Sequence, residues 1–350
     1  MKDLRVLVVD DSALNRRTLS ELVTQRPGAQ VVGTAADGDE ALKMASMLEP
    51  DLITLDLEMP RMDGFTFLRL LMANRPTPVV VVSSHAGKEN VFRALELGAI
   101  DFITKPDQLL SGDTEGVKQQ LDRMIAVVRQ LSPASVGAAQ MPSQPPPAQG
   151  KVPARPAADH VPRRVVVIAA STGGPTALMR LFSRLPAHAR GAVVVAQHMP
   201  ERFTTTFAER LDRQSAFRVR EAEHLHELRA GTALVCPGGR CLEIARRDDT
   251  LVARVVFPGR DDRYAPSADR LMASAAKVMG EGVMAVVLTG MGDDAGKGVV
   301  AVKEAGGVVL AEAEDTAVVY GMPQVAMKTG CVDEMLPLDR LIDRVVEALT

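Results

Sequence analysis

The chain has 350 residues, 46% of them hydrophobic, and its 41 lysines and arginines nearly balance its 44 aspartates and glutamates, giving a net charge of −3. This length suits two or three domains, and the charge balance argues against a nucleic-acid-binding surface. Three cysteines are too few for a disulfide framework, and no apolar run approaches the ~20 residues of a membrane span. Because the first residues also lack the apolar region of a signal peptide, we expect a cytoplasmic protein without direct membrane insertion.

Residues 1–131 alternate short apolar runs with segments of helical spacing. Helices are predicted to begin near residues 13, 39, 64, 88 and 113. The strands between them are predicted at 5–9, 31–35, 51–55, 78–82 and 100–104. Five such units predict a doubly wound, flavodoxin-like parallel sheet of five strands.

Polar residues follow the predicted strands of this first domain. These strand-end residues are Asp10, Asp11, Asp56, Ser83 and Lys105. Because three carboxylates at one sheet edge cannot all stay ionised cheaply, they predict a bound cation, and oxygen ligands suit Mg²⁺. One aspartate could then attack a phosphoryl donor, while a hydroxyl and an ammonium receive the phosphoryl oxygens. The plainer alternative is that the aspartates cap helices and Lys105 pairs with one of them.

Three motifs resemble those of two-component receiver domains: Val8-Val9-Asp10-Asp11-Ser12, the run from Leu55-Asp56 to Asp63-Gly64, and Thr104-Lys105-Pro106. The resemblance implies that Asp56 accepts the phosphoryl group from a sensor histidine kinase. It further implies that Asp10 and Asp11 bind Mg²⁺ together with Asp56, that Ser83 and Phe102 are the switch hydroxyl and switch aromatic, and that Lys105 contacts the phosphoryl group.

Residues 132–162 contain eight prolines and seven alanines and no Phe, Leu, Ile or Tyr. Such a segment cannot build a hydrophobic core, and its proline cluster favours extended backbone. We interpret it as a linker between the first domain and a second domain at 163–350.

The second domain again alternates strands and helices, which predicts an α/β fold with a mainly parallel sheet. Strands are predicted at 165–170, 192–197, 217–223, 283–289, 308–311 and 331–336, with a β-hairpin insertion within 232–257. Helices are predicted at 176–185, 200–214, 267–279, 297–305 and 338–349.

Three of these strands lead to residues that together can perform nucleophilic catalysis. Ser171 follows the first strand at a Gly173-Gly174 turn, His198 follows the second, and Asp293-Asp294 follow the strand at 283–289. A serine is a weak nucleophile unless a base takes its proton, and an imidazole acts best when a carboxylate fixes its tautomer. Ser171 could instead simply cap a helix, and His198 could be a structural histidine.

Other ligand sites remain open from spacing alone. The Gly290-x-Gly292-x-x-Ala295 run with Glu312 downstream matches a dinucleotide fingerprint, although two aspartates in the turn would repel a pyrophosphate. The Ser171 turn could cradle a phosphate, but no Walker lysine follows it. His224 and His226 could bind a metal only with a third ligand, Cys236 and Cys241 lack zinc spacing, and the charged run 260–263 is interpreted as a solvated loop.

Residues 165–349 resemble the catalytic domain of chemotaxis-type protein-glutamate methylesterases. The matching motifs are Ala170-Ser171-Thr172-Gly173-Gly174-Pro175, Gln197-His198-Met199-Pro200, Tyr264-Ala265-Pro266-Ser267-Ala268-Asp269 and Leu288-Thr289-Gly290-Met291-Gly292-Asp293-Asp294. The resemblance implies a catalytic group of Ser171 as nucleophile, His198 as base, Asp294 rather than Asp293 as carboxylate, and the Met291 backbone N–H as an oxyanion donor, with Thr172 beside the nucleophile. Two departures are Ala169 and Ala295, where the family usually has glycine.

The resemblance implies hydrolysis of glutamate γ-methyl esters on methyl-accepting chemoreceptors, and deamidation of receptor glutamines, with Mg²⁺ needed only for receiver phosphorylation and no cofactor for the esterase. The alternative is a receiver joined to a catalytically silent domain that docks on receptors. Because the linker is too poor in apolar residues to transmit a rigid signal, we expect the unphosphorylated receiver to restrain the esterase by domain contact and phosphorylation of Asp56 to relieve that restraint.

Overall fold

The computed structural model describes residues 3–83, 87–105, 115–131 and 160–350. The chain divides into two compact units, one on each side of residue 142, and each is described by itself. The predicted linker at 132–162 lies outside the described residues except for its last three positions.

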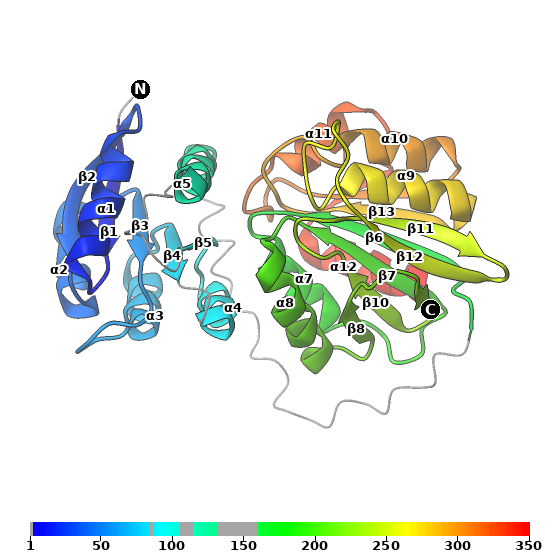
Figure 1. Ribbon diagram of the computed structural model, residues 1–350, viewed down its shortest axis with the longest axis horizontal. Coiled ribbons are helices and arrows are strands. Elements are labelled where there is room, and N and C mark those ends of the chain that lie inside the picture. The colour runs from blue at the N-terminus through cyan, green and yellow to red at the C-terminus, as the bar shows by residue number, and fades with distance from the viewer. Residues whose placement is uncertain (1–2, 84–86, 106–114, 132–159) are drawn as a thin grey trace. The chain divides into compact units, whose positions relative to one another are not determined.

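The first unit contains the predicted five-stranded parallel sheet, with helices on both of its faces (Figure 1). Its strand order is β2-β1-β3-β4-β5, which is a doubly wound topology. The strands are β1 Leu4–Val9, β2 Ala29–Ala35, β3 Leu52–Leu55, β4 Val79–Ser83 and β5 Asp101–Thr104. The helices are α1 Ala13–Thr24, α2 Gly38–Leu48, α3 Gly64–Asn74, α4 Lys88–Glu96 and α5 Glu115–Val128.

Local sequence signals explain where these helices begin. Ser12, Asp37 and Asp63 precede α1, α2 and α3, and each side chain accepts a backbone N–H from the first turn of its helix. The central strands β3 and β4 are buried along their whole length, as expected for a parallel sheet covered on both faces. The predicted start of the last helix, near residue 113, lies outside the described residues.

The second unit is built on a seven-stranded parallel sheet of order β15-β14-β13-β6-β7-β10-β8. Its strands are β6 Arg164–Ala170, β7 Gly191–Gln197, β8 Arg218–Glu221, β10 Thr232–Val235, β13 Val283–Val287, β14 Val308–Glu312 and β15 Glu334–Leu336. A separate antiparallel sheet contains β9 His226–Leu228, β11 Cys241–Arg247 and β12 Thr250–Val256. The α/β class and the hairpin are therefore confirmed.

The prediction missed short elements within the hairpin region and near the C-terminus. Residues 232–235 form β10, which pairs with β7 and β8 in the parallel sheet and not with the hairpin. The short strand β9 and the helix α11 Met322–Lys328 were not predicted. The strand β9 has three residues and the helix α11 has seven, so each is too short for a hydrophobic period to reveal its conformation.

Helices cover both faces of the large sheet (Figure 1). One face carries α9 Ala268–Met279, α10 Gly296–Glu304 and α11, and the other carries α7 Gly174–Phe182, α8 Glu201–Gln214 and α12 Leu338–Leu349. On the first face, alternate residues of β6, β7 and β13 form one apolar core with α9, which also packs on β11. This packing fixes the start of α9 beside the carboxyl ends of the strands.

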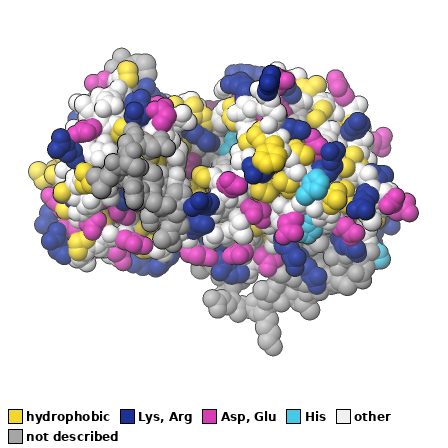
Figure 2. All heavy atoms as spheres, viewed as in Figure 1, with side chains coloured by type: hydrophobic (Ala, Val, Ile, Leu, Met, Phe, Trp, Pro, Cys, Tyr) yellow, Lys and Arg dark blue, Asp and Glu magenta, His cyan; other side chains and the backbone are white. Residues whose placement is uncertain are grey.

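The face drawn in Figure 2 carries charged side chains of both signs. In the view of Figure 2, Lys and Arg side chains are interspersed with Asp and Glu side chains over the described residues. This distribution agrees with the small net charge. None of the described helices is both long enough and apolar enough to cross a lipid bilayer.

Candidate phosphoacceptor and catalytic sites

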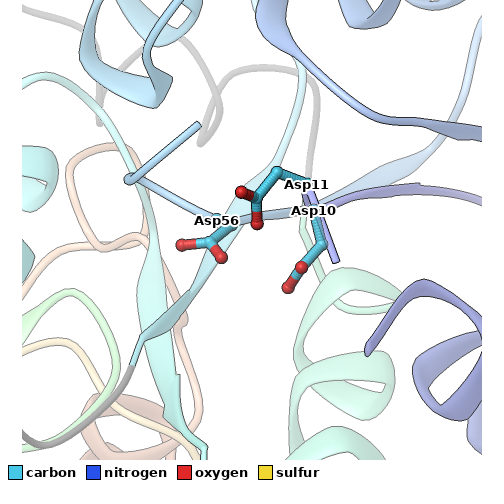
Figure 3. Close-up of side chains that lie close together, drawn as sticks. All are labelled: Asp10, Asp11 and Asp56. Carbon is cyan, nitrogen blue, oxygen red and sulfur yellow. The ribbon is translucent and has the colours of Figure 1, made fainter. Parts of the chain in front are cut away.

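Three aspartates gather at the carboxyl edge of the first sheet. Asp10 and Asp11 follow β1 and Asp56 follows β3, and one carboxylate oxygen from each lies within 4.8 Å of the others (Figure 3). Lys105, after β5, places its ammonium 2.6 Å from Asp10 Oδ2 and 2.6 Å from Asp56 Oδ2. One ammonium therefore bonds two of the three clustered carboxylates.

Backbone and side-chain donors hold the loop that carries Asp10 and Asp11. Asp10 Oδ1 accepts hydrogen bonds from the Ser12 N–H at 2.9 Å and from Asn15 Nδ2 at 3.2 Å. The Arg16 guanidinium donates to the backbone carbonyls of both aspartates. This network leaves Asp10 Oδ2 for Lys105 and orients the loop toward Asp56.

The charges in this cluster shift one another's protonation. Burial raises the pKa of Asp56, Asp10 raises it further, and Lys105 and the Glu58 N–H oppose the rise. Burial lowers the pKa of Lys105, but Asp56 and Asp10 outweigh it, so the net pKa is raised. A cluster with excess carboxylate and oxygen-only donors fits Mg²⁺, which a receiver domain uses for phosphorylation.

The two predicted switch residues lie on neighbouring strands. Ser83 ends β4 and pairs in register with Thr104 of β5, and Phe102 lies two residues earlier on β5. Both side chains are buried, with 7% of each residue exposed. The alternative was that the aspartates only cap helices and that Lys105 pairs with one of them. Lys105 instead forms ion pairs with two of the three, Asp10 and Asp56.

Ser171 follows β6 directly, at the carboxyl edge of the second sheet. Its N–H donates to the Thr289 carbonyl at 3.0 Å, and its carbonyl accepts the Gly174 N–H at 2.8 Å. Gly173 has φ of 79°, and a Cβ there would lie 2.7 Å from the Val318 Cβ. The turn therefore requires glycine for its conformation and for its space.

His198 follows the neighbouring strand β7, and its N–H donates to the Ala170 carbonyl at 2.9 Å. Its Nε2 lies 2.8 Å from Asp294 Oδ2, and the two side chains are 7% and 1% exposed. Because Nε2 faces the carboxylate, Nδ1 is the ring nitrogen left to take a proton from a nucleophile. The carboxylate partner that a histidine base requires is thus in place.

Backbone amides at the start of α9 hold Asp294. Its Oδ2 accepts the Ala268 N–H at 2.7 Å, and its Oδ1 accepts the Asp269 N–H at 3.0 Å. Burial alone would raise the pKa of Asp294, but His198 and these two amides lower it below its usual value. The helix start and the imidazole together keep this buried carboxylate ionised.

The loop between β13 and α10 carries both Met291 and Asp294. Gly290 donates its N–H to the Val319 carbonyl at 3.0 Å and accepts the Met322 N–H at 2.7 Å. The Thr289 hydroxyl donates to the Thr172 carbonyl at 2.9 Å, which ties this loop to the Ser171 turn. The peptide before Met291 is therefore fixed next to the nucleophile.

Sequence reasoning did not identify two buried polar residues that organise this edge. Gln197 Nε2 donates to the carbonyls of Ser171 at 2.9 Å and His198 at 3.1 Å, so one amide joins the nucleophile and base segments. Glu312 was considered as a ribose ligand, but its Oε2 accepts the Thr289 N–H at 2.8 Å. Burial raises the pKa of Glu312 to about 7.

The described residues give no support to the alternative dinucleotide and metal sites. With Glu312 bonded inside the fold, the dinucleotide fingerprint loses its acidic residue. Within the described residues, the group with metal-ligand geometry is the three receiver aspartates, and His224 instead contacts the Val255 carbonyl through Nδ1. Cys236 and Cys241 are buried free thiols.

The two departures from the methylesterase pattern are both fully buried. Ala169 lies inside β6, and Ala295 precedes α10 with φ of 79°. This left-handed conformation costs a non-glycine residue roughly 1–2 kcal/mol, which accounts for the preference for glycine. Ala295 nevertheless donates its N–H to Asp294 Oδ1 at 3.1 Å, so the carboxylate keeps its backbone donors.

Fold and site together define a response regulator whose output domain has the layout of a serine hydrolase. A family model described as CheB methylesterase matches residues 166–345, and one described as response regulator receiver domain matches residues 6–111. The chain belongs to the protein-glutamate methylesterase family.

Relatives match along nearly the whole chain. A protein-glutamate methylesterase/protein-glutamine glutaminase of Anaeromyxobacter dehalogenans is 51% identical over 99% of this chain and 96% of its own length. One from Geobacter sulfurreducens is 46% identical over 99% of this chain and 98% of its own length. The crystal structure of the Thermotoga maritima CheB methylesterase catalytic domain is 35% identical, covers 53% of this chain and 98% of that one, and has a TM-score of 0.52.

Proposed function

We propose that this protein is a phosphorylation-regulated serine esterase that hydrolyses glutamate γ-methyl esters on methyl-accepting chemoreceptors and deamidates receptor glutamines. The observation that carries this proposal is the 2.8 Å contact between His198 Nε2 and Asp294 Oδ2 at the sheet edge where Ser171 follows β6. The family membership and the names of the full-length relatives support the substrate class.

In the first half of the reaction, the Ser171 hydroxyl attacks the γ-carbonyl carbon of the glutamyl ester. His198 takes the hydroxyl proton at Nδ1, and Asp294 stabilises the resulting imidazolium through Nε2. The Met291 backbone N–H donates to the developing oxyanion, with Thr172 beside the nucleophile. His198 then protonates the departing methoxide, so methanol leaves and an acyl-serine remains.

In the second half, water attacks the acyl-serine with His198 again acting as base. Ser171 is regenerated, and the receptor side chain becomes a glutamate. A glutamine side chain passes through the same acyl-serine with ammonia as the leaving group, so one site serves both reactions. No step in this scheme uses a group other than the chain's own residues and water.

In the receiver, residues 1–131, we propose that Asp56 accepts a phosphoryl group from a sensor histidine kinase. Asp10, Asp11 and Asp56 would hold Mg²⁺, which when bound offsets the negative charge of the carboxylates and the phosphoryl oxygens. Lys105 and Ser83 would contact the phosphoryl oxygens, and Phe102 would repack as Ser83 moves. The linker at 132–162 joins this domain to the catalytic domain at 163–350.

The test is release of methanol from a cytoplasmic chemoreceptor fragment that carries glutamate methyl esters. Replacing Ser171 by alanine should lower the rate of methanol release by roughly 10³-fold or more, because the nucleophile is lost. The free energy of unfolding should be unchanged, since the Ser171 hydroxyl is a small group that follows a strand. Activity of Ser171→Ala within a few fold of the wild type would exclude this triad. Receptor binding without any methanol release by the wild type would favour the silent docking domain.

A further inference from the structure

Tyr264 covers one face of the catalytic imidazole. Its ring lies parallel to the His198 ring, with an interplanar angle of 5° and centroids 4.8 Å apart. Asp294 holds the same imidazole in the ring plane through Nε2. The edge and the face of His198 are therefore each held by a different residue.

The phenol of Tyr264 is itself fixed by a second aspartate. Its hydroxyl donates to Asp293 Oδ1 at 2.8 Å, and Arg263 donates to Asp293 Oδ2 at 2.6 Å. Residues 260–263 lie outside helices and strands, and the Arg263 side chain stays 73% exposed while it pairs with Asp293, which is consistent with the expected solvated loop. The Tyr264 hydrogen bond and Arg263 lower the pKa of Asp293, so this acceptor is ionised at neutral pH.

The backbone leaves room for the phenol in this position. Gly292 has φ of 113°, and a Cβ there would lie 2.6 Å from the Tyr264 hydroxyl oxygen. A side chain at 292 would push the tyrosine off the imidazole. The glycine, the aspartate and the arginine thus converge on one ring orientation.

A stacked aromatic face has a chemical effect on a histidine base. The face of an aromatic ring carries partial negative charge and attracts cations, so it favours the imidazolium over the neutral imidazole. A hydrogen bond from the hydroxyl to a carboxylate increases the electron density of the ring. The imidazolium forms when His198 takes the Ser171 proton, so a contact that favours it lowers the barrier to attack.

We propose that Tyr264 is a positioning residue of the esterase, oriented by Asp293 and Arg263, which fixes the His198 ring and stabilises its protonated form. The proposal rests on the proposed function and assigns the adjacent aspartates separate tasks. Asp294 binds the edge of the imidazole, and Asp293 holds the tyrosine on its face. The charged or titratable groups that the structure places around the ring are Asp294, Tyr264, Asp293 and Arg263.

The experiment compares the full-length wild type with Tyr264→Leu, Tyr264→Phe and Tyr320→Phe, using methanol release from the esterified receptor fragment across pH. Tyr264→Leu removes the aromatic face but keeps an apolar side chain. Its kcat should fall about tenfold with KM within about twofold, and the acidic limb of its kcat/KM profile should move to lower pH. Tyr264→Phe keeps the ring and should retain at least about a third of the rate.

Tyr320→Phe is the matched control, because its hydroxyl contacts the sulfurs of Met327 and Met335 and not His198. It should match the wild type. Equal losses in Tyr264→Phe and Tyr264→Leu, a change confined to KM, or an unmoved acidic limb would each overturn the proposal. Absence of methanol release by the wild type would instead mean that the proposed function fails.

Discussion

The half-buried Asp56 and the buried Asp294 both lie at the carboxyl edge of a parallel sheet, yet their pKa values shift in opposite directions. Burial raises the pKa of Asp56, and Asp10 raises it further against the opposing Lys105, so its ionised form is under-compensated. Asp294 receives hydrogen bonds from backbone amides and His198, so its ionised form is favoured.

The contrast shows how one fold position supports two chemistries. An under-compensated carboxylate attracts a divalent cation and can take up a phosphoryl group. A fully compensated carboxylate stays charged without a metal and can hold a histidine in one orientation. Donors from the backbone, which the residue type does not reveal, decide between the two outcomes.

The largest effect, on kcat, is expected from replacing Asp294, the fully compensated carboxylate. Asp294→Asn should lower kcat by roughly 10³ to 10⁴, because the amide favours the wrong imidazole tautomer and cannot stabilise the imidazolium. Asp293→Asn should cost less than about tenfold, since the amide oxygen still accepts the Tyr264 hydroxyl. Methanol release by the two variants checks this, and the reverse ranking would contradict the assignment of Asp294.

The sequence revealed the residues that follow strands and missed those that act from elsewhere. Asp56, Ser171 and His198 stand directly after apolar runs, and Asp294 lies in the loop that follows one, so the parallel-sheet rule brought them to an edge. Tyr264 belonged to a motif that carried the family resemblance, but its contact with His198 depends on how α9 packs.

Glu312 shows the same limit for a buried carboxyl. Spacing after a glycine-rich turn suggested a ribose ligand, and only the fold shows that it accepts the Thr289 N–H. The short elements β9 and α11 were missed for a related reason, because tertiary pairing and not local pattern defines them.

A smaller effect, on stability, is expected at Glu312. Its carboxyl is compensated less fully than that of Asp294, because the Thr289 N–H only partly offsets its burial. With its pKa raised from 4.5 to about 7, the folded state keeps a proton that the unfolded chain releases. The contribution of Glu312 to stability therefore falls as pH rises from about 4.5 to 7, with Asp315 adding to the pKa shift and Arg180 opposing it.

The check is urea unfolding of the catalytic domain at pH 5 and pH 8. Between pH 5 and pH 8 the free energy of unfolding of the wild type should fall by about 2–3 kcal/mol more than that of Glu312→Gln, because glutamine does not titrate. The variant keeps an oxygen that can accept the Thr289 N–H. Identical losses in the two proteins would show that Glu312 does not titrate in this range.

The smallest effect is expected in the under-compensated cluster. Asp56→Asn should raise the stability of the receiver by up to about 1 kcal/mol at pH 7 without metal, because one of three carboxylates is removed and Lys105 keeps Asp10. Mg²⁺ should stabilise the wild-type receiver against urea and stabilise the variant much less. Equal Mg²⁺ responses would place the cation elsewhere.

A fragment beginning near Val161 sharpens the comparison by separating the two sites. If the receiver restrains the esterase, this fragment should release methanol faster than the unphosphorylated full-length protein. A fragment that is no faster would exclude restraint by occlusion and leave direct activation or docking as the receiver's role.

The most direct test of the account is methanol release by full-length wild type and Asp56→Asn, each with and without a small phosphoryl donor and Mg²⁺. The donor and Mg²⁺ together should raise the wild-type rate about tenfold, which needs a shift of only ~1.4 kcal/mol between restrained and active forms. Asp56→Asn should not respond. A wild type that ignores the donor, or a variant that responds equally, would contradict control of the Ser171 site by the Asp56 site.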